Sequence, residues 1–162
     1  MNRIEIQKWL LRWLHGQGLE TDATTRSEVV VTVGDGKITW TCRIICENAP
    51  ATVHYLSRLP GRLPESLVAN MAIRLLDLNR QIRFGQFSLD SQRRTITFRL
   101  TQQITKDAPL DIQFCNAMTL SHRIMTTHGQ ILLLFLDSIT SNSVHKLNLI
   151  EQTPPLHEYE NN

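Results

Sequence analysis

The sequence predicts an α+β fold, in which an antiparallel sheet of three plus two strands carries packed helices in the order α-β-β-β-α-β-β-α. The main observation is a strongly amphipathic segment, 64–82, that leads almost directly into two alternating runs, 84–90 and 94–103. A helix and a three-strand unit precede this segment, and another helical pattern follows it. The chain has 162 residues, 41% of them hydrophobic, which is enough for one domain with a sizeable core.

The first helix is expected at about residues 4–15, because apolar side chains recur there at spacings of three and four. Gly16 and Gly18 supply its C-terminal stop. The polar, threonine-rich stretch 16–28 is then expected to be a loop. The β-branched run 29–33 is typical of a buried strand.

A hairpin turn is expected at residues 33–37, where two glycines flank an aspartate. In the following strand, 37–47, alternate residues are apolar and should face the core. These residues are Ile38, Trp40, Cys42, Ile44 and Cys46. Asn48-Ala49-Pro50 interrupts the pattern, so 52–59 is predicted to be a third antiparallel strand.

Pro64 is well placed in the first turn of the second helix, whose wide apolar band is expected to cover the sheet. The segment 84–103 should form a hairpin with its turn at 90–93. In the last helix, Asp107 is the expected N-cap, and Gly129 a break or kink. The run 131–136 is apolar on every side, which favours burial from more than one direction, including by a second subunit.

One domain is expected over residues 1–147, followed by a flexible tail, 148–162, with two consecutive prolines and a polar end. Charged residues inside the N-terminal apolar pattern argue against a signal peptide. The longest apolar run has six residues, whereas a membrane-spanning helix needs roughly 20. The three cysteines contain no C-x-x-C pair, so a cytoplasmic location is expected.

No motif for catalysis, cofactor binding or metal binding is found. The chain has no G-x-S-x-G elbow and no H-x-x-x-H or H-E-x-x-H spacing, and Gly34-Asp35-Gly36 is better interpreted as a hairpin turn than as a phosphate loop. We therefore expect no catalytic, cofactor-binding or metal-binding residues. Cys42, Cys46 and Cys115 are interpreted as small core residues; an enzyme that used Cys42 or Cys46 is the third hypothesis.

An excess of arginine distinguishes the segment 58–99, which has eight arginines against three acidic residues, while the whole chain has a formal net charge of only +2. We consider six of them as an anion-facing patch: Arg58, Arg62, Arg80, Arg83, Arg93 and Arg94. The alternative is that they solvate the outer helix face and the hairpin tip. The scarcity of aromatic residues in the segment favours this alternative.

Two tryptophans on the first helix, Trp9 and Trp13, lie beside Lys8 and Arg12. This arrangement is also found in membrane-surface helices. The polar face is short and only modestly basic, so packing in the core or at an interface is favoured.

Residues 76–79 (LDLN), 84–90 (FGQFSLD) and the strand at 95–100 resemble motifs of the YbjN family of bacterial sensory-transduction regulators, which share the fold of type III secretion chaperones. The resemblance covers about residues 3–140. It implies a small cytoplasmic protein, often dimeric, that offers hydrophobic surface to a protein partner. Asn79 would finish a helix, and Gly85 would let the chain enter a strand.

The leading hypothesis is a noncatalytic, chaperone-like or regulatory module that binds a protein partner or client segment by strand addition or apolar pockets. It is expected to form a homodimer, with a heterodimer as the alternative. The residues expected to bind the partner are Trp9, Trp13, Leu132 and Phe135. The chain is slightly basic, with a sequence pI near 8.6, unlike the strongly acidic secretion chaperones. The alternative is a regulator that contacts nucleic acid through the arginine segment 58–99.

Overall fold

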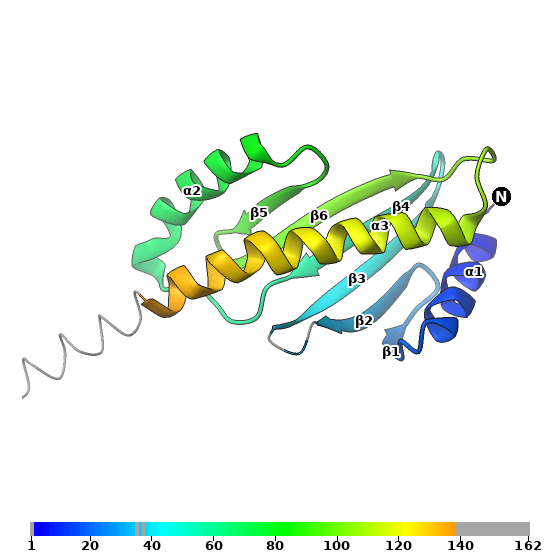
Figure 1. The fold of residues 1–162 in the computed structure, drawn as a ribbon, viewed down its shortest axis with the longest axis horizontal. Helices are drawn as coiled ribbons and strands as arrows, with labels where there is room; N and C mark the ends of the chain where they lie inside the picture. Colours follow the sequence, from blue (N-terminus) through cyan, green and yellow to red (C-terminus); the bar gives the residue numbers. More distant parts are fainter. Residues whose placement is uncertain (1, 35, 37, 139–162) are drawn as a thin grey trace, which may run out of the picture. The chain divides into compact units, whose positions relative to one another are not determined.

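The computed structural model describes residues 2–34, 36 and 38–138 (Figure 1). Contacts along the chain divide it into two compact units, 1–130 and 131–162. The predicted domain boundary at residue 147 and the predicted tail lie outside the described residues.

The described residues of the first unit form three helices and six strands. The helices are α1 (Arg3–Gly16), α2 (Val68–Gln81) and α3 (Leu110–Ile124), with a 3-10 turn η1 (Glu65–Leu67) before α2 and a π-helical turn η2 (Met125–Gly129) after α3. The strands are β1 (Thr21–Thr24), β2 (Glu28–Gly34), β3 (Thr39–Asn48), β4 (Ala51–Arg58), β5 (Gln86–Asp90) and β6 (Thr95–Gln103). They form one antiparallel sheet in the order β1-β2-β3-β4-β6-β5, which confirms the predicted α+β class.

Strand β1 is an addition to the five predicted strands, because it lies in the stretch expected to be a loop. It pairs with β2, and its register shifts between Thr21 and Ala23. Threonine favours strands whereas Asp22 and Ala23 do not, so the propensity of this segment is mixed and the pairing with β2 stabilises it as a strand. Within β2, Val29 and Val31 are fully buried while Val30 is only half-buried, so this strand is covered on one face.

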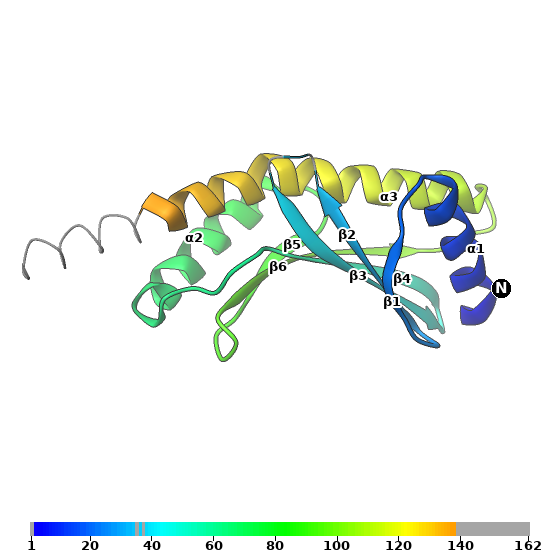
Figure 2. The same ribbon diagram turned by 90° about the horizontal axis from the view of Figure 1, so that it is seen from below.

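The core lies between one face of the sheet and the helices α1 and α3, which Figure 2 shows on the same side. The alternation predicted for β3 is confirmed, since Trp40, Cys42, Ile44 and Cys46 are each at most 3% exposed. The largest fully buried side chains include Tyr55 and Phe98 of the sheet, Phe114 of α3, and Ile6, Leu10 and Leu14 of α1. No described helix covers the opposite side of the sheet, which we call the open face.

Helix α2 does not cover the sheet as predicted. It packs against the edge strand β5, whereas α3 lies across β4 and β6 (Figure 1). Only Met71 and Leu75 of α2 are buried, and Ile73 and Leu76 are 63% and 58% exposed. Amphipathicity predicted that one face of this helix is buried, but not which strand would bury it.

Asn79 fixes α2 to β5. Its side-chain Oδ1 accepts a 2.7 Å hydrogen bond from the Phe87 N–H, and its Nδ2 donates a 2.8 Å bond to the Phe87 carbonyl. The helix continues to Gln81, so the predicted role of Asn79 in ending it is wrong. Asn79 instead satisfies the outward-facing backbone groups of an edge strand.

Gly85 connects α2 to β5 at a position that no other residue fits. Its φ is +78°, in the left-handed region, and a Cβ there would lie 2.5 Å from Phe98 Cζ and 2.6 Å from the Arg99 carbonyl oxygen. The glycine is therefore required by backbone conformation and by close packing together.

Helix α3 begins at Leu110 with Pro109 as its N-cap, so the predicted N-cap role of Asp107 is wrong. The preceding loop is held by the buried side chain of Gln113 instead. Its amide accepts a 3.1 Å hydrogen bond from the Thr105 N–H and donates a 3.0 Å bond to the Thr105 carbonyl.

Gly129 does not break the last helical segment, but it ends the π-helical turn η2. In the second unit, residues 131–138 are helical. Ile131 and Leu134 are 60% and 62% exposed, so these two residues are not buried within the chain itself. Burial of this run by a second subunit stays a prediction. Within the described residues, no helix has the length and apolarity needed to span a membrane.

Candidate functional site

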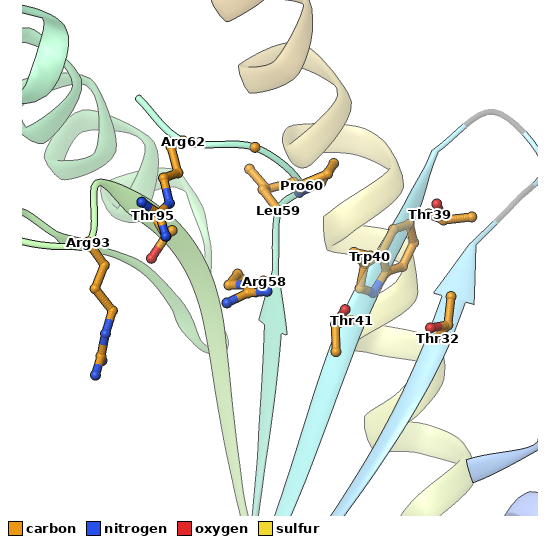
Figure 3. Close-up of a pocket in the computed structure, with 11 residues that line it drawn as sticks. Thr32, Thr39, Trp40, Thr41, Arg58, Leu59, Pro60, Arg62, Arg93 and Thr95 are labelled. Carbon is orange, nitrogen blue, oxygen red and sulfur yellow. The ribbon is translucent and has the colours of Figure 1, made fainter. Parts of the chain in front are cut away.

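A cavity of about 520 Å³ opens where β4 leaves the sheet (Figure 3). Strand β3 stays paired with β2 as far as Thr39, but its pairing with β4 ends at Thr41 and Arg58. The loop 59–62 then turns away from β3 and leaves a gap between them. We call this cavity the arginine notch; its lining residues are Thr32, Thr39, Trp40, Thr41, Arg58, Leu59, Pro60, Gly61, Arg62, Arg93 and Thr95.

Three arginines reach the notch from three segments: Arg58 from the end of β4, Arg62 from the following loop and Arg93 from the β5–β6 turn. Arg93 extends away from the other two in Figure 3, and its Nη1 lies 3.4 Å from Asp90 Oδ2. The Arg93 backbone N–H also donates a 2.9 Å hydrogen bond to Asp90, which is the main reason that the pKa of this exposed carboxyl is lowered. Among the described residues, no carboxylate lies within 4.0 Å of the guanidinium of Arg58 or Arg62.

Positively charged side chains also lie on the open face of the sheet, next to the notch. Cross-strand register places Leu56 of β4 between Arg43 and Arg99. Arg43 is neutralised by Glu28, through bonds of 2.6 and 2.9 Å that lower the pKa of the carboxyl and raise that of the guanidinium. Arg99 and Arg58 therefore carry the charge of this face that no described carboxylate offsets.

The other three arginines of the predicted patch lie elsewhere. Arg80 pairs with Asp77 on α2 at 3.2 Å. Arg83 lies over the ring of Phe84, 5.4 Å from its centroid, and lines a different cavity. Arg94 adopts a φ of 56° in the β5–β6 turn. The structure thus brings together Arg58, Arg62 and Arg93, and separates them from Arg80, Arg83 and Arg94.

A second cavity, of about 450 Å³, lies between the end of α2 and the helical segment containing η2. Arg83, Arg123 and His128 line it together with apolar side chains, and Phe84 is 54% exposed there. Sequence reasoning missed this site, because its residues come from segments about forty positions apart that no periodic pattern connects.

A carboxylate–imidazole–hydroxyl chain crosses three strands of the open face. Glu47 Oε2 lies 3.2 Å from His54 Nε2, and His54 Nδ1 lies 2.9 Å from Thr101 Oγ1. The connectivity is that of a catalytic triad. However, His54 pairs on both sides, with Ile45 and Thr101, whereas Glu47 and Thr101 lie beyond the residues that pair with β2 and β5. None of the three side chains lines either of the two cavities described above, so no substrate site accompanies this connectivity there. Only the strand register could have predicted this chain.

The thiols have two distinct environments. Cys42 and Cys46 are buried, as predicted, and desolvation raises the pKa of each to about 11. Such thiols are poor nucleophiles at neutral pH. Cys115 was predicted to be a core residue but is exposed on α3, so that interpretation is wrong.

The residues predicted to bind a partner differ in exposure. Trp9 is 44% exposed, with the guanidinium of Arg12 4.5 Å from its ring centroid. Trp13 is half-buried, and its ring centroid lies 6.2 Å from that of Phe114. In the second unit, Leu132 is buried and Phe135 is half-buried.

A further apolar surface lies on α2. Ile73 and Leu76 are three positions apart and are both largely exposed, and we call this pair the α2 ridge. The amphipathic pattern of the helix does not distinguish these two apolar residues from the buried Met71 and Leu75. The ridge became evident only when the structure showed α2 packed at the sheet edge.

Comparison with known proteins supports the fold. No family model matches the chain, and no curated protein matches it. Among solved structures, the chain is similar to YbjN from E. coli, a proposed transcription regulator, with a TM-score of 0.54 and 14% sequence identity over 84% of this chain and 93% of that one. At this identity the similarity shows the fold alone: the chain has the YbjN-like α+β architecture.

Proposed function

We propose that this protein is a noncatalytic regulatory module that binds a protein partner through exposed apolar surface, and that its first partner is a second copy of itself. The observation that carries the proposal is the α2 ridge. Ile73 and Leu76 are 63% and 58% exposed on a helix that packs through Met71 and Leu75. Covering two such side chains would contribute about 2–4 kcal/mol, since full burial of one contributes about 1.5–3 kcal/mol.

The hydrogen bonding and length of the two edge strands favour partner binding through α2 over partner binding by strand addition. At the β5 edge, the Phe87 N–H and carbonyl groups already bond to Asn79. At the other edge, β1 has four residues and an irregular register. Short, bulged edge strands discourage pairing with another chain. The helix surface is therefore the better supported contact.

The buried thiols support the noncatalytic part of the proposal, and we also propose a cytoplasmic location. Cys42 and Cys46 are free, and their raised pKa values keep them protonated at neutral pH. Free thiols used as core residues suit a reducing compartment. The YbjN-like fold, found in a proposed transcription regulator, agrees with a regulatory role.

The test compares wild-type protein with the double variant Ile73→Glu/Leu76→Glu by sedimentation velocity over a range of concentrations. We expect the wild type to dimerise as concentration rises and the double variant to remain monomeric. Arg74→Glu is the matched control, because Arg74 is exposed on another face of the same helix and its replacement changes the net charge by as much as the double variant does; it should dimerise like wild type. A wild-type protein that stays monomeric at millimolar concentration, or a double variant that dimerises equally well, would refute the α2 contact.

Nucleic acid is the second candidate partner, because Arg58, Arg62 and Arg93 gather at the notch and Arg99 lies on the same sheet face as Arg58. It ranks second because Trp40, the aromatic residue at the notch, is only 3% exposed and offers no surface for base stacking. A gel shift that weakens steeply with salt would support this candidate. Absence of a shift at low salt would remove it.

A further inference from the structure

We infer that the arginine notch is a binding site for the phosphate group of a small phosphorylated molecule. The inference does not depend on the α2 ridge. It rests on the charge, the donor groups and the dimensions of the cavity.

The arginine notch is positively charged. Arg58, Arg62 and Arg93 approach one cavity from three segments, and no acidic residue is among its lining residues. Only Arg93 has a described carboxylate nearby, Asp90 at 3.4 Å. Like charges brought together repel each other, and an anion between them removes that repulsion. The guanidinium group is the side chain that best matches phosphate oxygens, because its planar fork can donate two parallel hydrogen bonds.

The donor groups beside these arginines are hydroxyls. Thr39, Thr41 and Thr95 line the notch, and a threonine hydroxyl can donate a hydrogen bond to a phosphate oxygen. The fourth threonine, Thr32, already donates to Asp22 at 2.8 Å. The notch therefore combines cationic and neutral donors, as phosphate sites do.

The dimensions favour a small molecule over a polynucleotide. A volume of about 520 Å³ lies within the range of small-molecule sites, roughly 300–1,000 Å³. Pro60 is exposed and forms an apolar part of the wall, which the organic part of a phosphate ester can contact. Arg80 and Arg83 lie on or next to α2 and do not extend the notch into a track for a backbone.

The experiment measures binding of three probes by isothermal titration calorimetry at constant ionic strength: inorganic phosphate, glucose 6-phosphate and adenosine monophosphate. We expect one or both esters to bind more tightly than inorganic phosphate. Arg58→Gln and Arg62→Gln should each raise the Kd about tenfold or more, because each removes a charge-assisted hydrogen bond. Arg80→Gln is the matched control, since it removes an arginine that already pairs with Asp77, and its Kd should equal that of wild type.

Circular dichroism of each variant establishes that it is folded, which we expect because Arg58 and Arg62 are exposed. The inference is overturned if no probe binds at 10 mM, or if Arg80→Gln weakens binding as much as Arg58→Gln. It is also overturned, in favour of the nucleic-acid candidate, if a single-stranded oligonucleotide binds the same arginines far more tightly than the mononucleotide. The double variant of the α2 ridge should still bind phosphate, so failure of the self-association proposal is distinguishable from failure of this one.

Discussion

Replacing Asn79 with alanine should destabilise the protein, because it removes two hydrogen bonds, of 2.7 and 2.8 Å, to the backbone of Phe87. Each such bond contributes about 1–1.5 kcal/mol, which gives a loss of about 2–3 kcal/mol. Alanine regains about 0.5 kcal/mol through its better helix propensity. We therefore expect the free energy of unfolding to fall by about 2 kcal/mol and the Tm by about 4–8 °C.

Urea unfolding followed by circular dichroism measures this change. Asn70→Ala is the matched control, because Asn70 lies on the same helix with its side chain exposed, and we expect that variant to be as stable as wild type or slightly more so. Asn79→Asp keeps the acceptor for the Phe87 N–H but places a carboxylate oxygen against the Phe87 carbonyl, so it should be at least as destabilising as alanine. If Asn79→Ala and Asn70→Ala differ by less than about 0.5 kcal/mol, the reasoning is wrong.

Three further predictions concern Gly85 and the cysteines. Gly85→Ala should cost about 2–4 kcal/mol in urea unfolding, because a Cβ would lie 2.5 Å from Phe98 Cζ at a φ of +78°; a loss below about 0.5 kcal/mol would contradict the packing described. Because the Cys42 thiol has a pKa of about 11 in the folded protein and an ordinary value of 9.0, it stays protonated when the unfolded chain has ionised. The stability that this buried thiol contributes is thus fully present below pH 9 and is lost between pH 9 and 11, by about 1.4 kcal/mol per pH unit. When unfolding is measured over this pH range, the free energy of unfolding of Cys42→Ala should therefore fall less steeply than that of wild type. With Ellman's reagent at pH 8, one thiol per native chain, that of Cys115, should react quickly, and all three should react in urea; rapid reaction of a native Cys115→Ser variant would show that Cys42 or Cys46 is accessible.

Sequence reasoning identified the strands whose side chains alternate and placed their inward residues correctly. In β3, Trp40, Cys42 and Ile44 fall on one face because a strand repeats every two residues. β1 was missed because its four residues form a strand only by pairing with β2, which no local pattern records. For α2, the apolar band indicated a buried face, but the Asn79–Phe87 bonds that dock it at β5 depend on tertiary structure.

The candidate site was predictable only in part. The excess of arginines in the segment 58–99 is visible in the sequence, and the inward positions of Phe98 and Leu100 imply that Arg99 faces the other way. Arg62 and Arg93 lie in loops, where side chains do not alternate in a regular pattern. Their proximity to Arg58 therefore depends on the path of the chain after β4, which the sequence does not show. The α2 ridge was likewise hidden, since exposure depends on where the helix docks.

Gly129, at the end of the π-helical turn η2, packs closely against Leu59, which follows strand β4. A Cβ at Gly129 would lie 3.1 Å from Leu59 Cδ2, and Leu59 directly follows Arg58 and is itself part of the cavity wall. A side chain at position 129 would require this leucine to shift by a few tenths of an ångström. The packing of the π-helical turn therefore constrains the position of one residue in the wall of the arginine notch.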